Sequence, residues 1–106
     1  MAQTKSTLIK EDLLLQLQNL NKIGKFYTDM VDDYVYFYQL KRKLQTDIRT
    51  KGIRYKQVNG NGIEVDKPNE SILNLTKINT QMLKILNDLG LKEPQEPDDP
   101  NGEDLL

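Results

Sequence analysis

The sequence contains no cysteine, no histidine and no tryptophan. Without cysteine, disulfides, thiolate nucleophiles and cysteine-based zinc sites are excluded. Without histidine, the imidazole that most often serves as a general base or metal ligand near neutral pH is missing. An enzyme of this sequence would depend on carboxylates, lysines and tyrosines alone, so we expect a protein that is not an enzyme and that needs no cofactor or metal.

Long hydrophobic runs are also absent. No apolar stretch approaches the roughly 18 to 20 residues that a membrane-spanning helix needs, and the N-terminal segment lacks the apolar run of a signal peptide. We therefore expect no membrane partner. The 106 residues suffice for one small domain. A chain of this size buries a modest share of its surface, so association with further copies is a common source of stability.

The net charge of −1 hides an uneven distribution along the chain. Residues 92–106 carry six acids and one lysine, whereas residues 1–91 carry 14 cations and 10 acids. Prolines interrupt the acidic segment three times, and this composition is typical of a disordered tail. We therefore divide the chain into a mildly basic domain, residues 1–91, and an acidic disordered tail, residues 92–106.

Apolar residues at spacings of three and four predict a short first helix over residues 8–20 and a long second helix over residues 26–51. Gly52 supplies a left-handed stop for the long helix. Two short runs, residues 53–58 and 63–65, flank Asn59-Gly60-Asn61-Gly62 and predict a β-hairpin or ordered loop. This loop lacks the lysine and the Ser/Thr of a phosphate-binding loop, so we interpret it as a turn.

A third helix is predicted to follow Pro68, with Asn69 or Ser71 as its N-cap. Gly90 followed by Leu91 matches the glycine-then-hydrophobic order of a Schellman motif at its end. The expected fold is mainly α: a short N-terminal helix, then a long helix and a C-terminal helix that form an antiparallel helical hairpin, connected by the β-hairpin or loop.

The stretch VDDYVYFYQLKRK, residues 31–43, places four of the seven aromatic residues within five positions. Successive helical residues turn by about 100°, so these side chains point all around the helix, and one partner helix cannot cover them. Either the short first helix covers the rest in a three-helix monomer, or other copies of the chain do. We favour other copies in a ring, with an interface formed by Tyr34, Tyr36, Phe37 and Leu40.

The segment from residue 41 to residue 56 is the strongest candidate for contact with nucleic acid. It carries seven cations and a single acid, Asp47. Phosphate binding needs clustered, reachable cations that displace counterions, and Tyr55 could contact a sugar-phosphate edge. The alternative is a solvated helix end, where cations meet the helix dipole favourably. The candidate residues are Lys41, Arg42, Lys43, Arg49, Lys51, Arg54 and Lys56.

A second candidate is the turn between the first two helices, where a helix-turn-helix would place Lys5, Lys10, Lys22 and Lys25 near a DNA backbone. We rank it lower because the next helix begins with three acids, Asp29, Asp32 and Asp33. Asp29 and Asp33 lie one turn apart and could share a metal ion, but an ion pair with a lysine or arginine of a neighbouring subunit is the favoured interpretation.

Three stretches together resemble the small subunit of phage terminase, in the short type found among phages of Gram-positive bacteria. They are YTDMVDDYVYFYQLKRKLQTDI, Lys67-Pro68-Asn69, and QMLKILNDLGLK with its closing Leu-Gly-Leu. The resemblance covers about residues 10 to 92. It implies a ring that recognises the packaging start site on double-stranded viral DNA in the host bacterial cytoplasm. It also implies recruitment and regulation of the large terminase subunit, which carries the motor and the nuclease.

Two features qualify what this resemblance implies. Many members bind DNA through an N-terminal helix-turn-helix domain, but about 25 residues precede the long helix here, too few for such a domain. The tail ends in two acids and two leucines, and the resemblance makes Leu105 and Leu106 a docking motif for the large subunit; a solvated end is the alternative. We expect a non-catalytic packaging subunit, with a helical protein–protein adaptor that does not bind DNA as the second hypothesis.

Overall fold

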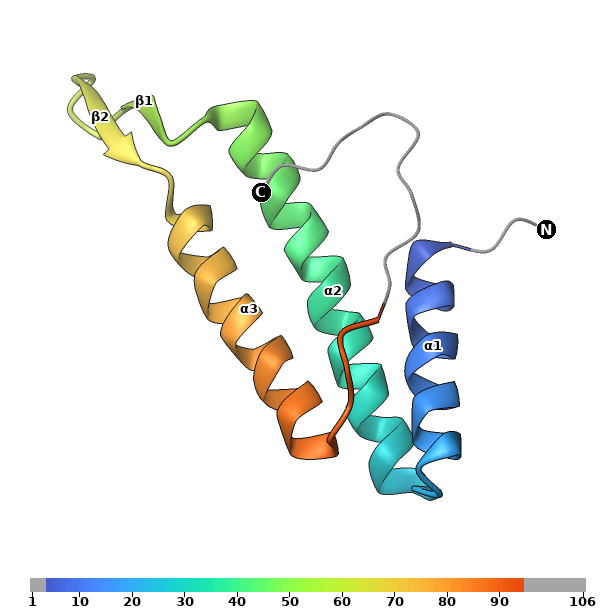
Figure 1. Ribbon diagram of the computed structural model, residues 1–106. Coiled ribbons are helices and arrows are strands. Elements are labelled where there is room, and N and C mark those ends of the chain that lie inside the picture. Colours follow the sequence, from blue (N-terminus) through green and yellow to red (C-terminus); the bar gives the residue numbers. More distant parts are fainter. Residues whose placement is uncertain (1–3, 95–106) are drawn as a thin grey trace.

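A computed structural model describes residues 4–94 of the chain (Figure 1). Three helices, α1 (Lys5–Asn19), α2 (Lys25–Lys51) and α3 (Glu70–Leu89), are joined by a hairpin of β1 (Arg54–Val58) and β2 (Glu64–Pro68). The mainly helical fold with a β-hairpin between the second and third helices confirms the prediction. Within residues 4–94, no helix combines the length and the apolar character that crossing a bilayer demands.

Helix α2 lies in the middle of the molecule. Helix α1 runs antiparallel to it along one side, and α3 runs antiparallel to it along the other, so α2 separates its two neighbours (Figure 1). After α3 the chain reverses direction, and residues 90–94 run beside α2 in the space between α1 and α3 (Figure 1). The β-hairpin projects from the end where α2 stops and α3 starts.

The core lies at the end of the molecule that is opposite the hairpin. Helix α1 contributes three buried side chains in a row of four-residue steps, which is the pattern of one helix face. They pack with residues from α2, α3 and the segment that follows α3, so the core needs all three helices. Its members are Ile9, Leu13, Leu17, Val31, Tyr34, Tyr38, Met82, Ile85, Leu86, Leu89 and Leu91.

The helix ends follow their sequence signals. Helix α1 begins earlier than expected because the Thr4 hydroxyl accepts a hydrogen bond from the Thr7 amide at 3.1 Å and caps the first turn. Asn69 caps α3 by accepting from the Ser71 amide at 3.0 Å. Gly90 ends α3 in the left-handed conformation, and the Leu91 amide donates to the Leu86 carbonyl at 2.9 Å, as a Schellman motif requires.

The hairpin is antiparallel, with Tyr55 opposite Lys67 and Gln57 opposite Val65. Its turn is organised by Asn59, whose side-chain oxygen accepts hydrogen bonds from the amides of Asn61 and Ile63. The second strand continues to Pro68, beyond the three residues that the sequence predicted. This extension brings Asp66 of β2 opposite Lys56 of β1.

The chain covers more of its aromatic segment than the sequence indicated. Tyr34 and Tyr38 retain 4% and 6% of their surface exposed, because α1, α3 and the segment after α3 surround them. Phe37 is half-buried against the core, whereas Tyr36 remains 63% exposed. Tyr34 therefore differs from the other three expected interface residues, since a side chain already covered by its own chain offers little surface to another copy.

Candidate nucleic-acid interface

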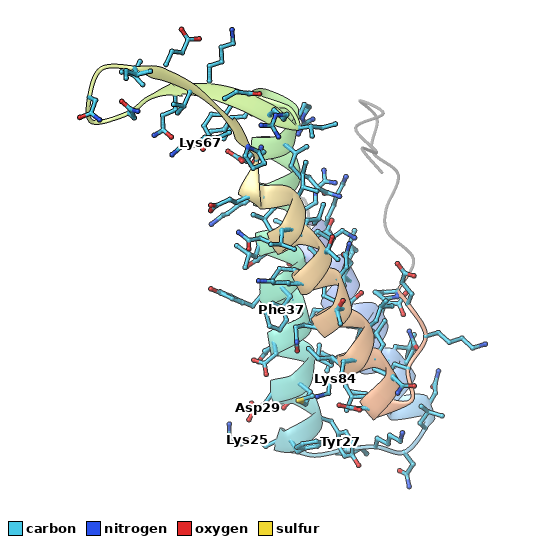
Figure 2. The ribbon with its side chains drawn as sticks, turned by 90° about the vertical axis from the view of Figure 1, so that its left-hand side faces the viewer. Lys25, Tyr27, Asp29, Phe37, Lys67 and Lys84 are labelled. Atoms are coloured by element: carbon cyan, nitrogen blue, oxygen red, sulfur yellow. The ribbon has the colours of Figure 1, made fainter. Side chains whose placement is uncertain are left out.

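The seven cations predicted to contact nucleic acid lie on the C-terminal half of α2 and on β1, and we call them the basic surface. They comprise Lys41, Arg42, Lys43, Arg49, Lys51, Arg54 and Lys56. The cations of β1 and of the last turns of α2 lie at the hairpin end of the molecule, whereas Lys41 lies near the middle of α2, beside the core (Figure 1). Lys67 of β2, labelled in Figure 2, adds an exposed cation that the sequence argument omitted.

A polar cluster at the base of the hairpin fixes the hairpin relative to the helices. The buried Asn69 donates to the Gly52 carbonyl at 3.0 Å, and its amide donates to the Ile53 carbonyl at 2.7 Å. Asp47 of α2 accepts a 2.6 Å hydrogen bond from the Ser71 hydroxyl of α3. These bonds tie the last turn of α2 to the first turn of α3, so the hairpin between them has a defined origin.

The same cluster perturbs one carboxylate. The Ser71 hydroxyl, the nearby Lys51 and the Asn69 side chain together hold the pKa of Asp47 below its ordinary value of 3.8, against a smaller opposing effect of desolvation. Hydrogen bonds to an ionised carboxylate favour its charged form, so Asp47 is ionised at neutral pH. Sequence alone could not find this cluster, because Asp47 and Ser71 are 24 residues apart.

Acids of β2 partly neutralise the strand part of the basic surface. Arg54 Nε lies 2.9 Å from Asp66 Oδ2, and Lys56 Nζ lies 3.6 Å from Glu64 Oε1. Both pairs are more than half exposed, so water still reaches them and a phosphate can compete for the cations. Over residues 41–68 the balance is eight cations against three acids, a weaker excess than the seven-to-one ratio of residues 41–56. Aligning the two predicted strands across the turn at residues 59–62 would have placed these acids near the cations of β1.

The helical part of the basic surface is distributed around α2. Lys51 pairs with Asp47 at 3.3 Å and also lies 5.2 Å from the centre of the Tyr55 ring. Arg42 and Arg49 lie seven residues apart and therefore share a helix face. They donate to Gln45 and Thr46, each at 3.3 Å. The neighbouring Lys43 is exposed, and Lys41 is half-buried.

Lys41 also lines a groove between α2 and α3, which we call the α2–α3 groove. Its walls include Tyr34 and Met82, and Glu93, from the segment that follows α3, also lines it. The groove holds about 280 Å³. It therefore brings together the first cation of the basic surface and the first acid of the tail.

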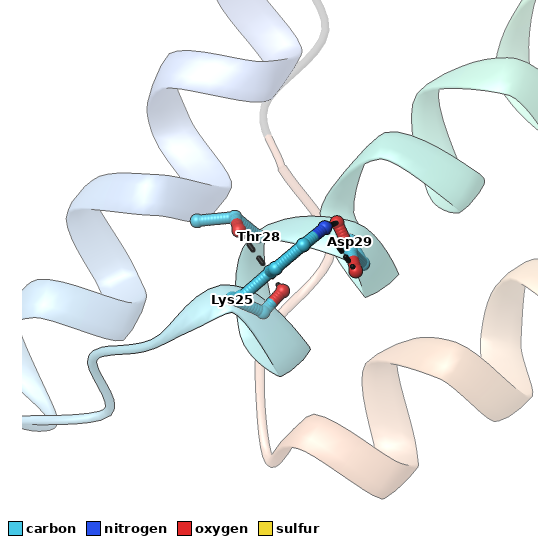
Figure 3. A network of polar contacts seen from close by, with 3 residues as sticks. All are labelled: Lys25, Thr28 and Asp29. Carbon is cyan, nitrogen blue, oxygen red and sulfur yellow. Dashed lines mark hydrogen bonds and ion pairs between the residues drawn. The ribbon is translucent and has the colours of Figure 1, made fainter.

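The lysines of the second candidate, at the turn between α1 and α2, already have partners inside the molecule. Lys10 pairs with Asp32 at 2.9 Å. Lys25 pairs with Asp29 at 3.2 Å, while the Thr28 hydroxyl donates to the Lys25 carbonyl (Figure 3). Asp29 thus pairs with a lysine of its own helix, whereas the sequence interpretation placed its partner on a neighbouring subunit. Within residues 4–94 there is no group of three acidic residues that could hold a metal ion.

Lys22 has a different role from the one expected of a DNA contact. Its ammonium group donates a 2.6 Å hydrogen bond to the Leu89 carbonyl at the C-terminal end of α3. Helices α1 and α2 run alongside each other (Figure 1), whereas the helices of a helix-turn-helix cross at a steep angle. This turn therefore favours structural contacts over DNA binding.

Exposed apolar side chains remain on α2 and α3. Tyr36, Leu73 and Leu83 are 63%, 59% and 61% exposed, and Tyr36 meets Phe37 edge-to-face at 6.0 Å between ring centres. Leu40 is half-buried. Of the four predicted interface residues, Tyr36 presents the most apolar surface, with Phe37 and Leu40 beside it.

A comparison of the sequence with known protein families identifies a relationship. Residues 11–96 match the family model described as phage terminase, small subunit. Searches of the curated proteins and of the solved structures return no match. The match covers most of the helical domain, including the aromatic segment of α2, the hairpin and α3. The chain therefore belongs to the phage terminase small-subunit family.

Proposed function

We propose that this protein is a non-catalytic DNA-packaging subunit that binds double-stranded viral DNA through the basic surface and recruits the large terminase subunit in the host cytoplasm. The observation that carries the proposal is the concentration of eight cations between residues 41 and 68, at the hairpin end of a member of this family. Clustered cations bind phosphates by releasing counterions, and they need no enclosed pocket to do so.

Assembly into a ring would multiply this contact. Tyr36, Phe37 and Leu40 on α2 supply one apolar face, and the exposed Leu83 on α3 supplies another. Because the two patches differ and lie on different helices, they suit a head-to-tail contact between copies, and such a contact closes into a ring when the rotation between copies permits it. Each copy would then present one basic surface, so weak phosphate contacts would add through avidity.

Binding of duplex DNA at two salt concentrations tests the proposal. The triple variant Lys43→Gln, Arg49→Gln, Lys51→Gln removes three cations of the basic surface. We expect affinity in low salt to fall about tenfold or more, and the slope of log K against log salt to shrink by roughly 0.9 for each lost phosphate contact.

The matched control is Lys25→Gln, Lys77→Gln, Lys84→Gln, which removes three exposed lysines elsewhere and should change affinity much less. Equal effects of the two triple variants would mean that net charge, not the basic surface, governs binding.

Recruitment of the large subunit is assigned to the C-terminal tail, where Leu105 and Leu106 follow two acids; these residues lie outside the described part of the chain. An acidic segment ending in two leucines can fold onto a basic-rimmed apolar groove of a partner. The double variant Leu105→Ser, Leu106→Ser should abolish stimulation of the large subunit's ATPase activity. Stimulation equal to that of the wild type would remove the tail from this role.

A helical protein–protein adaptor that does not bind DNA is the second candidate. The ion pairs of Arg54 with Asp66 and of Lys56 with Glu64 favour it, because they already satisfy two cations of the basic surface. The adaptor predicts no binding of duplex DNA even in low salt, while oligomer formation and large-subunit binding persist. The same titration therefore separates the two candidates.

A further inference from the structure

The path of residues 90–94 links the two oppositely charged parts of the chain. After the Gly90 turn, Leu91 enters the core, and Lys92 exchanges two backbone hydrogen bonds with the Gln16 side chain, at 2.8 and 3.0 Å. Pro94 is buried. These contacts hold the segment in the space between α1 and α3, so it leaves the body at one defined place (Figures 1 and 2).

That place adjoins the start of the basic surface. Glu93 and Lys41 line the same α2–α3 groove, and from Lys41 the cations of α2 continue toward the hairpin. Among the described residues Lys41 and Lys43 have no ion-pair partner, unlike Lys51, Arg54 and Lys56. The end of the described chain therefore lies next to cations whose charge is not compensated.

The rest of the chain has the charge and the length to reach them. Residues 95–106 lie outside the described part and carry five acids and no cation. Twelve residues reach at most about 40 Å when extended, whereas the helix from Lys41 to Lys51 rises only about 15 Å. We propose that residues 95–106 bind back onto the basic surface of the same chain and compete with DNA phosphates for it. This inference rests on the proposed DNA-binding role of that surface.

Tethering makes such competition effective even though each contact is weak. A segment attached beside its own binding site experiences an effective concentration of about a millimolar or more. DNA and the tail would then exclude each other, and by linkage DNA binding would release the tail to the same extent as the tail weakens DNA binding. Competition by the tail would weaken binding to DNA that makes few contacts with the protein. When DNA occupies the basic surface, the tail would be released, and Leu105 and Leu106 would become available to the large subunit.

The first test measures duplex DNA affinity in the full-length chain. Neutralising three tail acids with Glu96→Gln, Asp98→Asn, Asp99→Asn should tighten binding about three- to tenfold in low salt, with a smaller gain in high salt, where charges are screened. The control variant Glu11→Gln, Asp33→Asn, Asp88→Asn changes net charge equally on the body of the protein. We expect less than about a twofold change from it; equal gains from both variants would overturn the proposal.

The second test detects the contact itself. A zero-length carbodiimide cross-linker should join tail carboxylates to Lys41 and Lys43 of α2 more often than to Lys77 and Lys84, which are exposed on α3. Duplex DNA should suppress these cross-links. A mixture of ¹⁴N- and ¹⁵N-labelled protein distinguishes cross-links within one chain from those between copies. No preference for Lys41 and Lys43, or cross-links only between copies, would refute binding to the same chain.

The two tests separate this inference from the proposed function. If no variant binds DNA, the assignment of the basic surface to DNA fails, while the cross-links still decide whether the tail occupies it. If all variants bind DNA with equal affinity, DNA binding stands and the competition by the tail is refuted.

Discussion

Lys22 at the turn between α1 and α2 donates a 2.6 Å hydrogen bond to the carbonyl of Leu89, the last residue of α3. A cation at the C-terminal end of a helix satisfies a carbonyl that has no partner within the helix and interacts favourably with the helix dipole. One side chain thus closes the end of α3 and joins it to the α1–α2 turn. The contact links residues 67 positions apart.

Replacing Lys22 by methionine should therefore destabilise the fold. The methionine retains the apolar stem but leaves the Leu89 carbonyl without its donor, and we expect the free energy of unfolding to fall by about 1 to 2 kcal/mol. Lys25→Met is the matched control, because that lysine makes only an exposed pair with Asp29 and should cost at most about 0.5 kcal/mol. Urea unfolding of both variants compares them; equal losses would deny Lys22 this role.

Gly90 should not tolerate a side chain. Its φ is +70°, and a Cβ atom there would lie 3.1 Å from Lys22 Nζ, so Gly90→Ala would add backbone strain and disturb the Lys22 contact. We expect a loss of about 1 to 2 kcal/mol. Gly60→Ala in the hairpin turn meets no atom within 4 Å and has no positive φ, so its midpoint of thermal unfolding should stay near that of the wild type. If Gly90→Ala had the same free energy of unfolding as the wild type, the left-handed cap at Gly90 would be contradicted.

Tyr34 and Tyr36 should separate folding from assembly. Tyr34 is 4% exposed in the core, and its replacement by alanine should lower the free energy of unfolding by about 3 to 5 kcal/mol. Tyr36 is 63% exposed, so Tyr36→Ala should change thermal stability of the dissociated chain little while it weakens oligomers in sedimentation velocity. An unchanged oligomer distribution for Tyr36→Ala would move the contact between copies to another face.

Asp47 should make stability depend on pH in the acidic range. Because its pKa is lowered in the folded state, the carboxylate stabilises the fold above the ordinary value of 3.8, and this contribution is lost as pH falls through the lower folded pKa. Asp47→Asn lacks the titrating group. The stability difference between wild type and this variant, from urea unfolding at pH 7 and at about pH 3, should shrink on acidification. A difference independent of pH would show that the charge of Asp47 is unimportant.

Much of the fold could be predicted from the sequence because its signals act over one or two turns. The spacing of apolar residues, the cap at Asn69 and the left-handed Gly90 all depend on neighbours within five residues, and each matches the structure. The hairpin could be predicted because two short runs with strand-forming residues flank the turn at residues 59–62. Its second strand extends further than predicted, because pairing with β1 adds residues that have low strand propensity by themselves.

The candidate site could be predicted less completely. The run of cations from Lys41 to Lys56 is a property of the sequence, but its charge balance depends on Glu64 and Asp66, which only the pairing of β1 with β2 brings near. Likewise, the sequence makes Lys22 a candidate DNA contact, whereas in the structure its ammonium group binds the Leu89 carbonyl of α3. Contacts across tens of residues carry no local signal.

The sequence by itself determined which segments become helices, where they end, and how charge divides between a basic body and an acidic tail, because these depend on local spacing and composition. Only the tertiary structure decided which aromatic side chains are covered. Helix α1 and residues 90–94 enclose Tyr34 and Tyr38, whereas Tyr36 stays exposed. The physical reason is that burial depends on which distant segments pack together, and α2 has neighbours on both sides that its own periodicity does not specify.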